Sequence, residues 1–133
     1  MGLLRFLTMD ISELSNELGM QQGRDTSEED VRSSITTMTG TKGQYENSII
    51  EFDGSITIGR DPQSADLIID DSNVSRLHCT ITYEPKDNTY IVTDHSTNGT
   101  FIGRDRIEKG KSRIVKKGTF IIIGQSGNNF RLD

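Results

Sequence analysis

Residue types suited to binding a phosphate group occur in three short segments that separate apolar runs. The segments are Gly59-Arg60, Ser75-Arg76-Leu77-His78 and Asp94-His95-Ser96-Thr97-Asn98-Gly99-Thr100-Phe101. An arginine offers a planar fork of N–H donors, and Ser, Thr and Asn side chains add short, directional donors. None of the segments includes a convincing base, nucleophile or metal cluster. The pattern therefore predicts a site that holds a phosphate by its oxygens and leaves its bonds intact.

Length and composition indicate one domain with additional chain outside its core. A chain of 133 residues has enough length for a single hydrophobic core, and only 32% of its residues are hydrophobic. The formal net charge of −5 argues against a nucleic-acid surface, which would carry a basic excess. An anion site must therefore be built locally, from a few basic residues in an acidic background.

The N-terminus and the cysteine content favour a soluble, cytoplasmic protein without direct membrane insertion. The apolar stretch at residues 1–7 is interrupted by Arg5 and is too short for a secretion signal or a membrane span. Cys79 is the single cysteine, so an internal disulfide is excluded.

The first 43 residues are interpreted as an N-terminal extension. Ile11, Leu14 and Leu18 share one face of a short predicted helix over residues 10–18. From residue 19 to residue 43 the chain is rich in Gly, Gln, Ser, Thr and acidic residues, which predicts a flexible linker. The folded domain is expected to span residues 44–133.

From residue 45 onward, short apolar runs alternate with turn signals such as Asp53-Gly54, Asp61-Pro62 and Asn98-Gly99. Nine short strands without intervening helices predict an all-β, antiparallel sandwich or barrel. The predicted strands are Tyr45–Ile50, Ser55–Gly59, Leu67–Ile69, Leu77–Tyr83, Tyr90–Thr93, Thr100–Ile102, Arg113–Val115, Thr119–Ile123 and Asn129–Leu132. In the predicted strand Leu77–Tyr83, successive side chains point to opposite faces of the sheet. This alternation places Leu77, Cys79, Ile81 and Tyr83 toward the core and His78 on the opposite face.

The order and separation of Gly59-Arg60, Ser75-x-x-His78 and Asn98-Gly99 resemble the forkhead-associated (FHA) domain. The resemblance covers roughly residues 43–133 and includes the run 65–70 and the ending around Phe120–Gly124 and Phe130-Arg131-Leu132. It implies a β-sandwich of about eleven strands whose loops at one end bind phosphothreonine peptides. The expected function is phosphorylation-dependent protein–protein interaction in signalling, downstream of a Ser/Thr kinase, with no enzymatic activity and no cofactor.

The resemblance also assigns roles to individual residues. Arg60 would hold the phosphate, Ser75 would donate its hydroxyl to another phosphate oxygen, and Arg76 would reach phosphate or peptide backbone. Thr97 would add a contact near the phosphate, and Asn98 would hydrogen-bond the peptide main chain. Structural support is expected from Gly59, His78 and Gly99, with His78 hydrogen-bonded to loop backbone.

Several alternatives stay open at this point. Ser75, His78 and Asp94 supply the residue types of a hydrolytic triad, although no nucleophile elbow or oxyanion hole accompanies them. His78, Cys79, Asp94 and His95 could be considered as metal ligands, but His78 and Cys79 point to opposite faces of one strand. A phosphorylation-independent assembly or scaffold domain is the remaining alternative. Lys116-Lys117 is interpreted as a solvated surface pair.

The extension itself contains possible ligands for the predicted site. Thr26 precedes the acidic residues 28–30, and Thr36, Thr37 and Thr39 lie in the predicted linker. If one of them were phosphorylated, the tether could present it to the site at high effective concentration and close the site to other peptides.

Overall fold

The computed structural model describes residues 4–7 and 33–133, which form twelve β-strands and no helix. The strands are β1 (Leu4–Leu7), β2 (Ile35–Lys42), β3 (Ile49–Asp53), β4 (Ser55–Gly59), β5 (Leu67–Ile68), β6 (Cys79–Glu84), β7 (Thr89–Asp94), β8 (Thr100–Ile102), β9 (Asp105–Arg106), β10 (Ser112–Lys116), β11 (Phe120–Ile123) and β12 (Asn128–Leu132). No helix in this part of the chain is long and apolar enough to cross a membrane.

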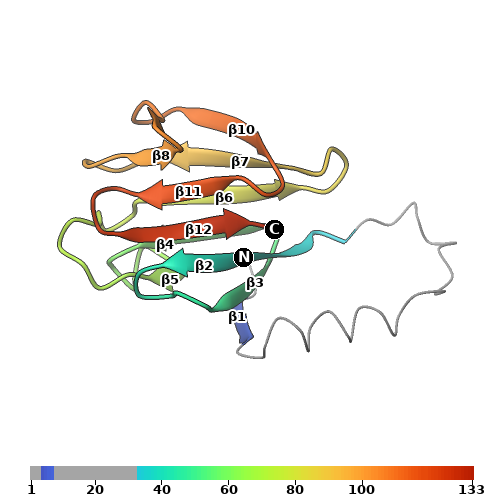
Figure 1. Cartoon of the computed structure of the whole chain (residues 1–133), viewed down its shortest axis with the longest axis horizontal. Coiled ribbons are helices and arrows are strands. Elements are labelled where there is room, and N and C mark those ends of the chain that lie inside the picture. The colour runs from blue at the N-terminus through green and yellow to red at the C-terminus, as the bar shows by residue number, and fades with distance from the viewer. Residues whose placement is uncertain (1–3, 8–32) are drawn as a thin grey trace, which may run out of the picture.

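The strands are arranged in two sheets that pack as the layers of a sandwich (Figure 1). The first sheet has the order β1-β3-β2-β12-β11-β8-β9, and the second has the order β10-β7-β6-β4-β5. Neighbouring strands are antiparallel except for β4 and β5, which are parallel. The predicted all-β sandwich is confirmed.

The core lies between the two sheets and follows from the period-two alternation of the strands. Tyr90 and Val92 of β7 are fully buried, as are Cys79 and Ile81 of β6 in the same sheet. Phe130 of β12 is buried from the other sheet. The predicted inward face of the strand around Cys79 is therefore correct for Cys79, Ile81 and Tyr83, while Leu77 precedes β6 and is only half-buried.

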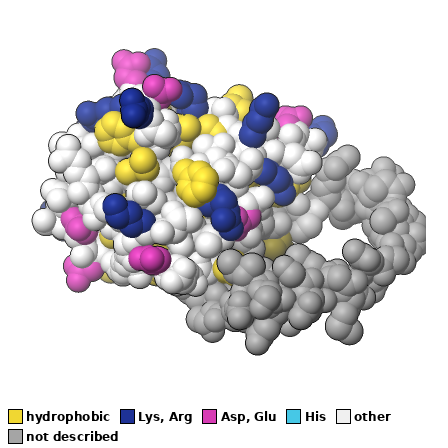
Figure 2. All heavy atoms as spheres, in the orientation of Figure 1, with side chains coloured by type: hydrophobic (Ala, Val, Ile, Leu, Met, Phe, Trp, Pro, Cys, Tyr) yellow, Lys and Arg dark blue, Asp and Glu magenta, His cyan; other side chains and the backbone are white. Residues whose placement is uncertain are grey.

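The outer surface carries mixed charges and a few exposed apolar side chains. Residues 33–133 contain twelve Lys and Arg against thirteen Asp and Glu, so this part of the chain is nearly neutral. Figure 2 shows apolar side chains grouped near the middle of the visible face, with basic and acidic side chains around them. The sandwich as a whole therefore imposes no strong electrostatic field of either sign on its loops.

The predicted flexible linker is wrong for residues 35–42, which form β2 in the middle of the first sheet. This strand pairs with β3 on one side and with β12 on the other, and Met38 is fully buried. Its sequence contains few apolar residues, but threonine is a good strand former. The folded domain therefore includes residues that the sequence places in the extension.

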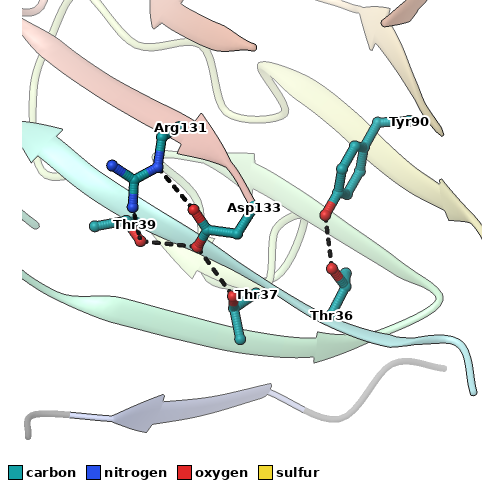
Figure 3. A network of polar contacts seen from close by, with 6 residues as sticks. All are labelled: Thr36, Thr37, Thr39, Tyr90, Arg131 and Asp133. Carbon is teal, nitrogen blue, oxygen red and sulfur yellow. Dashed lines mark hydrogen bonds and ion pairs between the residues drawn. The ribbon is translucent and has the colours of Figure 1, made fainter. Parts of the chain in front are cut away.

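Hydrogen bonds of the threonine side chains fix β2 in place (Figure 3). The hydroxyl of Thr36 lies 2.6 Å from the hydroxyl of Tyr90 in the core. Thr37 and Thr39 both donate to the Asp133 carboxylate, at 2.9 and 2.8 Å, and Arg131 pairs with the same carboxylate. These three threonines are thus held in a strand and are not flexible ligands for the site. Thr26 and the predicted helix over 10–18 lie outside the described residues.

Two other features of the strand assignment differ from the prediction. Residues 45–48 form a turn, with Asn47 in the left-handed region at φ 69°, and the strand predicted there begins at Ile49. The short strands β1 and β9 were not predicted, since each has only a few residues and β9 consists of the charged pair Asp105-Arg106.

Candidate functional site

The predicted site residues lie in three loops at one end of the sandwich, on the left in Figure 1. Arg60 follows β4, residues 69–78 connect β5 to β6, and residues 95–99 carry the chain from β7 to β8. The last of these loops crosses from the second sheet to the first. Hydrogen bonds described below connect the three loops to one another.

The backbone around Gly59 sets the position of Arg60. The Arg60 amide donates to the carbonyls of Ser75 and Arg76, at 2.9 and 3.1 Å. A Cβ atom on Gly59 would lie 2.0 Å from the Arg76 carbonyl oxygen, so a side chain does not fit there. Glycine at this position therefore allows β4 to approach the neighbouring loop closely.

The Arg60 side chain is anchored at one nitrogen and exposed to solvent. Its Nε donates to the Val74 carbonyl at 2.9 Å, next to Ser75 in the chain. Among the described residues, its two terminal nitrogens have no hydrogen-bond partner and no carboxylate lies within 4 Å. The guanidinium is thus held in place with donors available for an anion.

The other two loops meet at Ser75 and the segment Thr97-Asn98. The Thr97 amide donates to the Ser75 Oγ at 3.1 Å, which leaves the hydroxyl hydrogen of Ser75 free to donate. The Asn98 side-chain amide donates to the Asn73 carbonyl at 2.8 Å. Arg76 is exposed, and no described residue is bonded to its side chain. The structure thus brings Arg60, Ser75, Thr97 and Asn98 together.

His78 is buried behind these loops and connects them. Its Nδ1 accepts a hydrogen bond from the Ser75 amide at 3.1 Å, so the ring proton is on Nε2, which donates to the Gly99 carbonyl at 2.8 Å. Burial lowers the pKa of His78 and so favours the neutral ring. The hydrogen bond to Gly99 and the charge of Asp94 partly offset this shift. Neither ring nitrogen contacts the Ser75 hydroxyl, so the geometry of a hydrolytic triad is not present.

Asp94 organises the loop between β7 and β8, and the sequence did not assign it this role. Its Oδ1 accepts hydrogen bonds from Ser96 Oγ at 2.6 Å and Thr100 Oγ1 at 2.7 Å, while Ser96 Oγ accepts from the Gly99 amide. All of these groups are buried, and Asp94 Oδ2 has no partner among the described residues. The network holds Thr97 and Asn98 outward. Strand alternation, which places Asp94 on the same face as Tyr90 and Val92, could have revealed it.

Arg106 in β9 is a second residue of the site region that the sequence analysis did not identify. Its Nη2 donates to the Thr97 carbonyl at 3.0 Å, and its side chain is exposed. It also lies beside Gly99, where an added Cβ atom would be 2.8 Å from Arg106 Nε. The sequence alone does not indicate the contact between Arg106 and Thr97, because it forms only when the β8–β9 hairpin folds back beside the loop of residues 95–99.

The four residues considered above as metal ligands are not grouped around a common point. The described residues contain no group of three His, Cys, Asp or Glu side chains placed to hold a metal ion. Cys79 is fully buried, and desolvation raises the pKa of its thiol to about 12, so the reactive thiolate is disfavoured. His95 instead lies 3.0 Å from the Thr80 hydroxyl through its Nε2.

Comparison with known proteins identifies the family. A family model for the FHA domain matches residues 56–124, which is more than half of the chain and includes all three loops. The chain belongs to the FHA family. The domains of this family are interaction modules.

Among curated proteins, this FHA domain is 38% identical over 84 residues to a probable serine/threonine-protein kinase, fhkA, of Dictyostelium discoideum. The match covers 58% of this chain and 14% of the kinase. The chain spans between 12% and 25% of the first curated relatives that it matches.

Solved structures share the fold. An FHA domain of an Arabidopsis thaliana hypothetical protein superposes with a TM-score of 0.65 at 21% identity, covering 77% of this chain and 86% of that one. The MEK1 FHA domain, solved in complex with a phosphothreonine peptide of HOP1, gives a TM-score of 0.55 at 16% identity. That match covers 76% of this chain and 98% of the MEK1 domain.

Proposed function

We propose that this domain binds phosphothreonine peptides and thereby mediates phosphorylation-dependent protein–protein interaction. The observation that carries the proposal is the Arg60 guanidinium, which Val74 fixes beside Ser75 while its terminal nitrogens stay available. A phosphothreonine carries close to two negative charges and three strong acceptor oxygens, which match these donors. The phosphothreonine peptide bound by the MEK1 FHA domain supports the same ligand class here.

Each site residue has a proposed role that agrees with its contacts. Arg60 binds the phosphate with its free terminal nitrogens, and Ser75 donates its hydroxyl to a second phosphate oxygen. Thr97, whose amide binds the Ser75 hydroxyl oxygen, adds a contact near the phosphate, and exposed Arg76 reaches phosphate or peptide backbone. Asn98 uses the oxygen and remaining N–H of its side chain on the peptide main chain. Gly59, His78 and Gly99 support these groups.

The same proposal includes the setting in which the domain acts. It is a binding module without enzymatic activity, and it takes part in a Ser/Thr kinase pathway in the cytoplasm. It requires no cofactor and does not bind nucleic acid or insert into membranes. The bonding of His78 to two backbone groups, away from the Ser75 hydroxyl, supports binding over hydrolysis.

A fluorescence-anisotropy titration tests the proposed function. We expect wild type to bind phosphothreonine peptides from a library more tightly than the phosphoserine or unphosphorylated forms. Arg60→Ala should weaken this binding about ten- to a hundredfold, because each lost charge-assisted hydrogen bond contributes roughly 1.5–3 kcal/mol. Arg104→Ala, on an exposed turn of the β8–β9 hairpin, is the charge-matched control and should bind like wild type. Equal binding by folded wild type and Arg60→Ala would refute the assignment.

A further inference from the structure

The β8–β9 hairpin lies beside the loop that carries Thr97 and Asn98. Phe101 and Arg106 are cross-strand partners in this hairpin, and both lie against Gly99. An added Cβ on Gly99 would be 3.0 Å from the Phe101 ring and 2.8 Å from Arg106 Nε. Because glycine has no side chain, this corner exposes an aromatic edge and a guanidinium next to Asn98.

Thr97 connects Arg106 to the proposed phosphate site. The amide of Thr97 binds the Ser75 hydroxyl, and its carbonyl binds Arg106 Nη2. The two hydrogen bonds and the backbone of Thr97 between its amide nitrogen and its carbonyl oxygen together set an upper limit on the separation of the two side chains. The Arg106 Nη2 atom therefore lies no more than about 10 Å from Ser75 Oγ. A peptide residue next to the phosphothreonine spans a comparable distance, since consecutive Cα atoms are about 3.8 Å apart and side chains reach further.

Arg106 also keeps its charge available. Its Nη2 binds Thr97, and no carboxylate of a described residue lies within 4 Å of its guanidinium. Asp105, the adjacent residue in β9, points to the opposite face of the strand by alternation. The Thr97 bond therefore holds a positive group beside the Thr97–Asn98 segment, and no carboxylate of the described residues neutralises it.

We propose that Arg106 is a specificity-determining residue of this surface, which selects peptides carrying an acidic side chain close to the phosphothreonine. This inference rests on the proposed function and extends it from the phosphate to the neighbouring residues. The ion pair would be exposed, so its effect should be modest and should weaken as salt is added.

The test uses the full chain and synthetic phosphothreonine peptides in which Asp, Ala or Lys replaces each residue near the phosphothreonine in turn. We expect wild type to prefer Asp over Lys at one position by about two- to fivefold, corresponding to an exposed ion pair. Arg106→Gln should abolish this preference, and Arg106→Lys should retain much of it because the charge remains. Arg104→Gln removes the same charge without the Thr97 contact, and it should keep the preference. Thermal melts establish that each variant is folded.

Other results would overturn the inference. An absence of any acidic preference in wild type would do so, as would an unchanged preference in Arg106→Gln. An equal loss in Arg106→Gln and Arg104→Gln would assign the effect to the general field of the hairpin. A uniform loss of affinity in Arg106→Gln with the preference intact would limit Arg106 to positioning Thr97. If phosphorylated and unphosphorylated peptides bound equally, the proposed function and this inference would both fail.

Discussion

Replacing His78 by Ala should destabilise the domain as well as weaken peptide binding. The imidazole is fully buried and makes one hydrogen bond to the Ser75 amide and one to the Gly99 carbonyl. Each such bond contributes roughly 0.5–1.5 kcal/mol net, and the Ser75 amide would lose its partner in a half-buried place. The missing ring also leaves a cavity. We therefore expect a loss of about 2–4 kcal/mol in the free energy of unfolding.

This loss is large enough to measure by calorimetry or by circular dichroism. For a domain of this size, about 1 kcal/mol corresponds to roughly 4–8 °C in Tm, so His78→Ala should melt about 8–32 °C below wild type. Ser75→Ala is the matched comparison, because its hydroxyl bonds only the amide of exposed Thr97, which water can replace. It should lose phosphopeptide affinity with nearly unchanged Tm. An early-melting serine variant beside a wild-type-like histidine variant would show that the two roles are wrongly divided.

The strands of the second sheet could be predicted because their sequences alternate clearly and end at strong turn signals. Ser55–Gly59 agrees with the structure at both ends, since Asp53-Gly54 precedes it and Asp61-Pro62 follows. β2 was missed because Thr36, a polar residue, faces the core. Its hydroxyl is satisfied there by the Tyr90 hydroxyl, a partner 54 positions away. A local pattern of apolar residues cannot reveal a polar group that a distant residue allows to be buried.

Contacts between distant residues also explain why the sequence analysis identified some site residues and missed others. Arg60, Ser75 and Asn98 belong to short motifs whose order along the chain is informative without coordinates. Arg106 lies outside these motifs, and its contact with Thr97 exists only because β9 folds back on β8. Asp94 is an intermediate case: strand alternation places it inward, but its bonds to Ser96 and Thr100 depend on the path of the loop.

Two further predictions concern the pH dependence of stability and the N-terminal boundary of the domain. Burial lowers the pKa of His78, so the unfolded chain takes up a proton near pH 6.5 and the folded domain does so only at a lower pH. The free energy of unfolding should therefore fall as the pH drops below about 6.5, by at most about 1.4 kcal/mol per pH unit. Urea unfolding at several pH values would measure this slope, and it should be smaller in His78→Gln; equal slopes would remove His78 as the cause. For the boundary, a chain that begins at Ser33 should unfold cooperatively, whereas one that begins at Gly43 should not. The shorter chain lacks β2, which separates β3 from β12 in the sheet and buries Met38, so its loss would open both pairings and the core. A cooperative thermal transition and phosphopeptide binding by the chain from Gly43 would show that β2 is dispensable and that the domain begins where the sequence alone placed it.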